Sequence, residues 1–230
     1  MPASAPRSIR TALRKVPHHY ITLLIAELIF ILVYPFFIGT EFRDELFRLF
    51  AVLVFCAALY AVLGRGRVTA LAFFLGLPAI GLHLLNVTGR FHFTHLPTLI
   101  LGVVFLIYIS GVFVWSIVSD PSVTTDTLAG AVSAYFLIGI TFGLVYSLIE
   151  QLMPGSFKDT IQPGKNIHQS EFVFFSFVTL TTVGYGDIVP WGAHARSVAI
   201  VEAVIGIMYP AVLISRLVGM HGSKRDSSKS

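Results

Sequence analysis

The sequence predicts an all-α membrane protein with six transmembrane helices and a short re-entrant helix between the fifth and the sixth. Hydrophobic residues make up 55% of its 230 residues, and charged residues make up 12%, about half the charged fraction of an ordinary soluble domain. The mean hydropathy is +0.81. Apolar stretches of about 18 residues or more recur along the chain, and each is long enough to cross the ~30 Å hydrocarbon core of a bilayer.

Six spans are predicted where apolar residues run between polar or basic segments. A further apolar segment, residues 171–182, would rise only about 18 Å as a helix, so we expect it to enter the membrane and return on the same side. The basic N-terminal segment is followed by no small-residue cleavage site, which argues against a signal peptide. The predicted spans cover residues 20–38, 46–63, 68–87, 96–118, 128–152 and 195–220.

The distribution of Lys and Arg predicts the orientation of the helices. With a cytoplasmic N-terminus, ten of the 16 Lys and Arg residues lie inside, including those of the turn Arg65-Gly66-Arg67 and of the C-terminal tail. Six spans then place both termini in the cytoplasm, and the re-entrant segment enters the cell (plasma) membrane from outside. The same residues account for the pI of 9.3, so we expect a lipid bilayer and no nucleic acid around the chain.

The re-entrant segment leads into the loop Thr182-Val183-Gly184-Tyr185-Gly186-Asp187. A pore that dehydrates a cation must offer oxygen ligands in place of water, and backbone carbonyls supply them when the chain turns them toward one axis. Glycine permits the positive φ angles that this requires. Irregular backbone at membrane depth is tolerated only where it is buried in protein or lines water, and an assembly around a pore provides both.

This hexapeptide resembles the selectivity filter of tetrameric potassium channels, and the whole chain resembles their six-span class, including the bacterial members without a long cytoplasmic domain. Two further matches support the resemblance. Pro190 follows Asp187 in the pattern Asp-Ile-Val-Pro, and Gly206 follows Gly184 by 22 residues, where the inner helix of the family usually has its hinge glycine. The resemblance implies a potassium-selective channel with no enzyme activity, which conducts K⁺ passively through a four-fold pore.

The resemblance also implies which atoms hold the ion. The carbonyls of Thr182, Val183, Gly184 and Tyr185 would bind K⁺, and Gly186 would complete the filter loop. K⁺ is the only bound species expected, with no organic cofactor. Because one chain carries one such loop, a closed ring needs several copies, and the family implies a homotetramer.

Asp187 and Thr179 are expected to support the filter, with two departures from the family pattern. Many members have a tryptophan at the position of Phe175, whose N–H holds the aspartate, and some bacterial members have a glutamate at Val178, which shares a proton with it. Neither residue offers such a partner here, so we expect altered filter stability or inactivation. Thr179 keeps a hydroxyl that can hold Tyr185.

Three residues of the sixth span are candidates for filter support and gating. Glu202 is a carboxyl within a span, and it either supports the filter or forms a hydrogen bond at a helix interface. Gly206 is either the gating hinge that the resemblance implies or a glycine that allows close helix packing. Pro210 would free a backbone carbonyl near Gly206 and bend the span, so it is also a candidate for the hinge.

The fourth span argues against strong voltage gating. Voltage sensors carry arginines there, because moving one charge across 100 mV changes the free energy by about 2.3 kcal/mol, and residues 96–118 contain no Lys or Arg. Glu27 is the only carboxylate expected within the first four spans, where it either forms a polar bond in the bundle or senses protons. The gating stimulus stays open between leak, pH, membrane tension, a ligand and a partner.

Two other transport functions and one enzyme class compete with this interpretation. A potassium transporter subunit would resemble four fused pore units, usually with a single filter glycine in each loop. A weakly selective cation channel usually has an acidic residue at the position of Tyr185. An intramembrane enzyme would need a nucleophile elbow, a metal-binding His pair or an aspartate dyad, and the sequence contains none of these.

The chain is expected to divide at the polar stretch between the fourth and fifth spans. The predicted order is a cytoplasmic N-terminal segment (1–19), a four-helix domain similar to a voltage sensor without gating charges (20–118), a linker (119–127), a pore domain (128–220) and a disordered tail (221–230).

Overall fold

The computed structural model describes residues 20–33, 36, 42–87, 95–119 and 124–227, and for residues 217–227 it describes the backbone alone. The chain is mostly helical and forms two compact units, Met1–Ala134 and Tyr135–Ser230. The boundary between the units falls inside a helix. The stretch predicted as a linker, residues 119–127, precedes this boundary, and its residues 120–123 lie outside the described ones.

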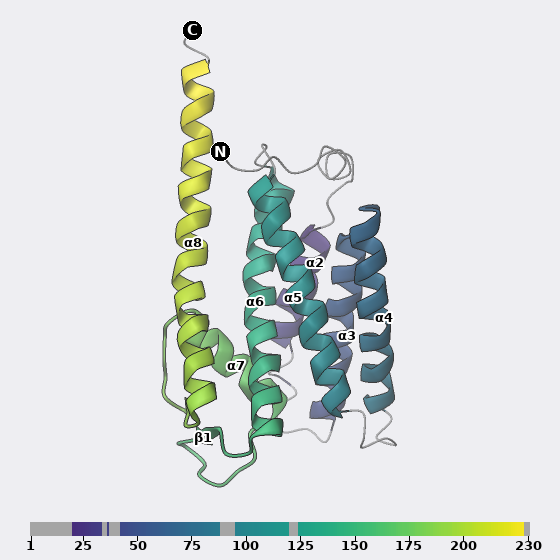
Figure 1. Cartoon of the computed structure of the whole chain (residues 1–230), viewed down its shortest axis with the longest axis vertical. Coiled ribbons are helices and arrows are strands. Elements are labelled where there is room, and N and C mark those ends of the chain that lie inside the picture. The colour runs from purple at the N-terminus through teal and green to yellow at the C-terminus, as the bar shows by residue number, and fades with distance from the viewer. Residues whose placement is uncertain (1–19, 34–35, 37–41, 88–94, 120–123, 228–230) are drawn as a thin grey trace. The chain divides into compact units, whose positions relative to one another are not determined.

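The described part of the first unit contains four complete helices, each of which packs against its neighbour in the chain (Figure 1). Aromatic rings fill the space between them: the ring centroid of Tyr20 lies 4.9 Å from that of Phe113, and that of Phe55 lies 5.0 Å from that of Phe105. Such close packing favours association of helices in lipid, which is itself apolar. The helices are α2 (Tyr20–Val33), α3 (Arg43–Ala61), α4 (Arg67–Val87) and α5 (His95–Ser119).

Four helices of the described residues are long and apolar enough to cross a membrane, and they correspond to the third to sixth predicted spans. The apolar helix α2 has only 14 residues, about 21 Å of helix. In the rest of the predicted first span, residues 34–35 and 37–38 lie outside the described part. The helix α3 begins with charged residues in its first turns. The first two spans, and the six-span topology with them, therefore stay predictions. The four apolar segments are Arg67–Leu85, His95–Ser119, Thr125–Leu152 and Ala193–Arg216.

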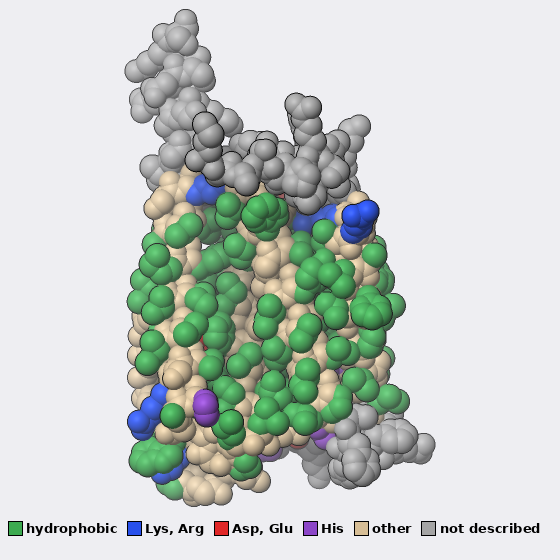
Figure 2. Space-filling model, in the orientation of Figure 1, with side chains coloured by type: hydrophobic (Ala, Val, Ile, Leu, Met, Phe, Trp, Pro, Cys, Tyr) green, Lys and Arg blue, Asp and Glu red, His purple; other side chains and the backbone are tan. Residues whose placement is uncertain are grey.

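Hydrophobic side chains dominate the face drawn in Figure 2, and its Lys and Arg side chains lie near helix ends. Large exposed apolar residues occur on every long helix, among them Ile25, Leu53, Phe74, Ile107 and Ile200. A soluble monomer rarely exposes contiguous apolar surface on this scale. The chain is therefore a multi-pass membrane protein.

The second unit contains most of α6 (Thr125–Leu152), the short helix α7 (Gln169–Leu180) and the long helix α8 (Ala193–Ser227) (Figure 1). The 12 residues of α7 make it as short as the sequence predicts. The helix α8 extends beyond the predicted end at residue 220, so the structure differs from the predicted disordered tail over residues 221–227. Adding residues to an existing helix costs less than starting a new one.

Two short strands complete the second unit, and the predicted all-α class missed them. The strands β1 (Phe157–Asp159) and β2 (Ile188–Pro190) pair antiparallel, with Lys158 opposite Val189. The first strand lies between α6 and α7, and the second lies between the loop that follows α7 and the start of α8. The pair therefore ties the two ends of the α7–loop segment together.

Candidate functional site

Two glycines of α6 allow α7 to approach it closely. Gly139 and Gly143 are four residues apart, and so they lie on one helix face. A Cβ atom added at Gly143 would lie 2.7 Å from the Cα of Val173, and one added at Gly139 would lie 2.8 Å from the ring of Phe177. Small residues at this spacing are a common packing device of membrane helices. The pair was not predicted from the sequence, although its spacing in an apolar helix was a signal for it.

The C-terminal end of α7 is held at one carbonyl group. The hydroxyl of Tyr135 in α6 donates a hydrogen bond of 3.2 Å to the backbone O of Leu180. Gly206 of α8 lies against the same carbonyl, because an added Cβ would overlap its O and lie 2.7 Å from its C. This geometry supports the close-packing interpretation of Gly206. Its role as a hinge stays a prediction, as does that of Pro210, which lies inside the helix α8.

The loop after α7 has an alternating backbone. The φ angles of Thr182, Gly184 and Gly186 are 60°, 62° and 78°, whereas Val183 and Tyr185 between them do not have positive φ. Glycine adopts this region freely, but a β-branched threonine there is an outlier, and such strain is typical of functional sites. In an extended strand, successive carbonyl groups point to opposite sides of the backbone. When φ alternates in sign, successive carbonyl groups point to the same side instead.

The N–H groups of this loop point back to α7. The N–H of Thr182 donates to the carbonyl of Thr179 at 2.9 Å, and those of Val183 and Gly184 donate to the carbonyl of Val178 at 2.9 and 3.3 Å. The carbonyls of residues 182–185 accept no hydrogen bond within the described part of the chain. The first three donors of the loop are thus satisfied, and four successive acceptors are left for another ligand.

The same loop lies on the surface of the single chain. The side chain of Tyr185 is 71% exposed and that of Val183 is 53% exposed, and the neighbouring loop residues are exposed as well. Lipid offers no hydrogen-bond donors, so backbone carbonyls in a membrane protein must face protein or water. A row of unbonded carbonyls on a single chain therefore needs water, a cation or further copies of the chain beside it.

Thr160 fixes the far end of the loop. Its hydroxyl donates to the carbonyl of Gly186 at 2.7 Å, and its N–H donates to the carbonyl of Asp187 at 2.8 Å. Thr160 directly follows β1, whose pairing with β2 places it there. The sequence offered no signal for this residue, because three-residue strands are too short to show a period.

The predicted support residue Asp187 binds its own neighbour in the chain. The carboxylate of Asp187 accepts a hydrogen bond of 2.9 Å from the N–H of the next residue, Ile188. The ring of Tyr185 stacks on Phe174, with centroids 6.2 Å apart and planes inclined by 6°. Among the described residues, the hydroxyl of Thr179 makes no hydrogen bond to Tyr185, so the predicted contact between them stays a prediction.

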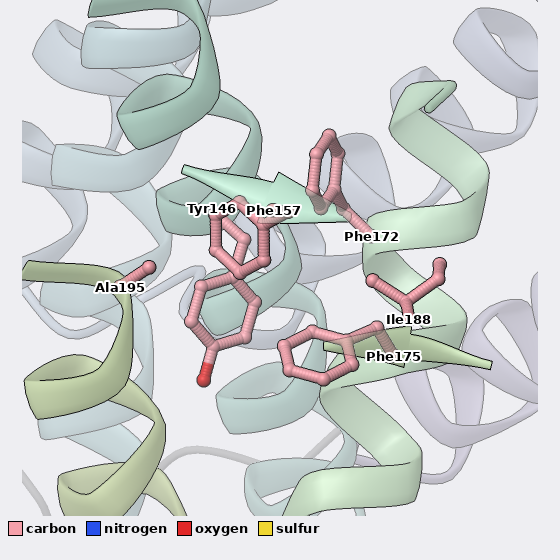
Figure 3. Close-up of a cluster of buried hydrophobic side chains, with 6 residues drawn as sticks. All are labelled: Tyr146, Phe157, Phe172, Phe175, Ile188 and Ala195. Atoms are coloured by element: carbon pink, nitrogen blue, oxygen red, sulfur yellow. The ribbon is translucent and has the colours of Figure 1, made fainter. Parts of the chain in front are cut away.

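A cluster of buried, mostly aromatic side chains lies between α6, α7, the start of α8 and the two strands (Figure 3). Phe175, where many relatives of the predicted family have a tryptophan, packs with its ring centroid 5.0 Å from Tyr146 and 5.7 Å from Phe157. Phe175 therefore packs against other rings, and it makes no hydrogen bond of the kind that a tryptophan N–H would donate to Asp187. The six residues of the cluster are Tyr146, Phe157, Phe172, Phe175, Ile188 and Ala195.

Glu202 joins the three helices of the second unit. Its carboxyl group is fully buried. The hydroxyl of Tyr146 in α6 lies within hydrogen-bond distance of one carboxyl oxygen, and the hydroxyl of Ser176 in α7 lies within hydrogen-bond distance of the other. Glu202 was predicted either to support the filter or to form a hydrogen bond at a helix interface. The two interpretations are compatible, because its hydrogen bond at the helix interface is made to α7, the helix that leads into the loop.

The first unit also contains a buried carboxyl group, that of Glu27. Glu27 is fully buried in α2. The hydroxyl of Ser133 lies beside it, but neither carboxyl oxygen makes a well-formed hydrogen bond to a described residue. Its role as a proton sensor stays a prediction. No Lys or Arg occurs in the helix α5, which is the predicted fourth span.

Comparison with known proteins finds a matching family and several relatives of this chain. Residues 134–221 match the profile of a family described as "Ion channel". Protein LctB of Bacillus caldotenax is 30% identical over 96 residues, which are 40% of this chain and 71% of LctB. LctB of Geobacillus stearothermophilus is 30% identical over 115 residues, 48% of this chain and 84% of its own length.

A potassium channel is also similar to this chain over a shorter part of its own length. The inward rectifier potassium channel Kirbac3.1 of Paramagnetospirillum magnetotacticum is 33% identical over 85 residues, which are 35% of this chain and 25% of the channel. No solved structure matches the fold significantly.

Proposed function

Because this chain belongs to the ion channel family, we propose that copies of it form a homotetrameric, potassium-selective channel that conducts K⁺ passively across the cell membrane. The observation that carries the proposal is the backbone of residues 182–186. Its φ angles alternate in sign, the N–H groups of residues 182–184 are bound to α7, and the carbonyls of residues 182–185 accept no hydrogen bond within the described part of the chain. Such a row of carbonyls, repeated around an axis, replaces the hydration shell of K⁺.

The proposed ion ligands are the carbonyls of Thr182, Val183, Gly184 and Tyr185. The N–H groups of three of these residues are held by the last turn of α7, so α7 fixes the orientation of their peptide planes. The C-terminal end of a helix also carries partial negative charge, which favours a cation near the start of the loop. K⁺ is the cargo of this site, and no organic cofactor is needed.

The exposed surface of the second unit supports an assembly of several copies. The loop is exposed in the single chain, and a row of large apolar residues on α8 is exposed as well, including Ile200, Val204 and Ile207. One loop cannot surround an ion, and a closed ring of identical loops requires cyclic symmetry. Four copies are proposed from the resemblance of the loop to the filter of tetrameric potassium channels.

Potassium selectivity is proposed rather than weak cation selectivity because Tyr185 stands where weakly selective relatives usually have an acidic residue. The name of the relative Kirbac3.1 includes the words potassium channel. A potassium transporter subunit is the other alternative, and its fused pore units would not fit a chain with one loop. The absence of Lys and Arg from α5 supports gating that does not depend strongly on voltage.

The proposal is tested by recording from the purified chain in liposomes with opposed K⁺ and Na⁺ gradients, at two voltages and two pH values. We expect a reversal potential close to the K⁺ equilibrium value. Equal permeation of K⁺ and Na⁺ would favour the weakly selective alternative. A flux that requires a coupled second ion would favour a transporter subunit, and the voltage and pH steps would separate leak from gating.

Replacement of Thr160 by valine should speed the loss of current during sustained conduction without changing the reversal potential. The change removes the hydroxyl bond to Gly186 and keeps the N–H bond to Asp187, at a cost of about 0.5–1.5 kcal/mol per copy. The rate of current decay in planar bilayers checks this. Thr125→Val, at an exposed position in the first turn of α6, is the matched control and should leave the decay unchanged. A Thr160→Val channel with wild-type decay would show that the hydroxyl bond does not hold the loop.

A further inference from the structure

Three oxygen-to-oxygen contacts lie in series at the centre of the second unit. The hydroxyl of Tyr146 contacts one carboxyl oxygen of Glu202, and the other carboxyl oxygen contacts the hydroxyl of Ser176. The same Ser176 hydroxyl lies 2.6 Å from the backbone carbonyl of Gly139. Glu202 and Ser176 are both fully buried, so bulk solvent does not reach these contacts.

The number of protons in this cluster decides its charge. A serine hydroxyl has one proton to donate, a carbonyl has none, and a tyrosine hydroxyl has one. If Glu202 were ionised, two protons would serve three contacts, and one pair of oxygens would face each other without a proton between them. If Glu202 carries a proton on the oxygen beside Ser176, each contact has one proton. The chain then runs from Glu202 to Ser176 and from Ser176 to Gly139, while Tyr146 donates to the second carboxyl oxygen.

We infer that Glu202 is a neutral carboxylic acid that donates its proton to Ser176 and thereby positions α7 between α6 and α8. Burying an ionised carboxylate is costly unless a cation or several donors compensate it. Among the described residues, Glu202 has no cationic partner, and its hydrogen-bond partners are the two hydroxyl groups alone.

The groups that titrate near Glu202 offer no positive charge to an ionised form. The helix α6 presents Tyr146 to it by contact and Tyr135 at longer range. The only acid of α7, Glu171, lies at the opposite end of that helix and is bound to Lys165. On α8 itself the nearest titratable groups in sequence before and after Glu202 are Arg196 and Tyr209, of which Arg196 donates to the carbonyl of Pro190.

The consequence rests on the proposed function, since α7 carries the loop that we propose as the filter. Ser176 lies within the last five residues of α7, one turn before the carbonyls that bind the loop N–H groups. The proton of Glu202 therefore holds that end of α7 against the carbonyl of Gly139. Glu202 acts here as a positioning residue and does not touch the ion.

The direct test is the infrared spectrum of the purified full-length protein at neutral pH, recorded for the wild type and for Glu202→Gln. The C=O stretch of a protonated carboxylic acid lies at a higher frequency than the stretches of a carboxylate or of an amide. We expect this band to be weaker in Glu202→Gln than in the wild type, and the difference spectrum of the two proteins removes the contribution of other buried carboxyl groups such as Glu27. A difference spectrum that shows carboxylate bands in its place would overturn the inference.

Matched glutamine substitutions provide a second test that does not depend on the spectrum. Glutamine at position 202 can donate to Ser176 and accept from Tyr146, so Glu202→Gln should leave the apparent Tm unchanged. The control is Glu150, whose two carboxylate oxygens accept hydrogen bonds from the N–H groups of Gly155 (2.8 Å) and Phe157 (3.0 Å). An amide accepts through one oxygen only, so Glu150→Gln should lower Tm by about 2–8 °C.

Ser176→Ala extends the comparison. It removes the acceptor of the Glu202 proton and should lower Tm, whereas a wild-type Tm in Ser176→Ala would contradict the inference. A Tm loss in Glu202→Gln as large as that in Glu150→Gln would also contradict it. Melting and spectra are measured in detergent without ion flux, so a protein that fails to conduct K⁺ in liposomes would overturn the proposed function and leave this result standing.

Discussion

Replacing Gly206 by alanine is expected to abolish the assembled channel. The added Cβ would overlap the carbonyl O of Leu180, and this carbonyl cannot move freely because Tyr135 donates to it. Overpacking costs about 1–3 kcal/mol and occasionally more, and an overlap with a backbone atom is the hardest to relieve. A shift of Leu180 would also displace the loop that begins two residues later. We expect loss of the monodisperse assembly in size-exclusion chromatography and a large fall in apparent Tm.

The control for this change is Gly111→Ala in α5, where an added Cβ would meet no atom within 4 Å. Alanine there should stabilise the helix by about 0.5–1 kcal/mol. The competing interpretation of Gly206 makes a different prediction. A Gly206→Ala protein that assembles with the wild-type Tm but rarely opens would show that Gly206 is a hinge and that its contact with Leu180 can relax.

Replacing Gly184 by alanine is expected to remove potassium selectivity. Gly184 has a φ angle of 62°, and a side chain in this region costs about 1–2 kcal/mol. The loop can relieve this strain by returning φ to negative values, which turns the carbonyls of the neighbouring peptides away from the common side. The expected result is a reversal potential that moves from the K⁺ value toward equal permeation of K⁺ and Na⁺, or complete loss of current.

The matched control is Gly155→Ala in the turn after α6. Gly155 has a φ of 84° and, like Gly184, open space around its Cα, so alanine imposes similar strain outside the loop. This variant should lose a little stability and keep its selectivity. Equal loss of selectivity in both variants would mean that the effect is global, and full selectivity in Gly184→Ala would remove the loop from the conduction path.

Many of the helices could be predicted, because the number of consecutive apolar residues in a stretch can be counted from the sequence and determines whether it can cross a bilayer. The predicted third span, 68–87, corresponds to Arg67–Val87, and the predicted fifth span, 128–152, corresponds to Thr125–Leu152. The short length of α7 and the candidate residues of the loop also followed from length and from the resemblance. The first two spans are less clear, since α2 is short and α3 begins with charged residues.

The parts that could not be predicted depend on contacts between residues far apart in the chain. Tyr146 and Glu202 are 56 positions apart and Ser176 and Glu202 are 26 apart, and no local pattern pairs them. The strand pair and the contact of Thr160 with the loop have the same origin. Gly206 shows what the sequence lacks. From the sequence, a glycine in a helix can be a hinge or a packing residue, and only the structure places the carbonyl of Leu180 beside it.

The most direct test of the account is an experimental structure of the assembled protein in K⁺, determined by cryo-electron microscopy in a lipid nanodisc. We expect four copies around one axis, with the carbonyls of residues 182–185 of every copy facing that axis and density for ions between them. An assembly in which these carbonyls face away from the axis, or in which the copies do not close a ring around the loop, would contradict the central claim.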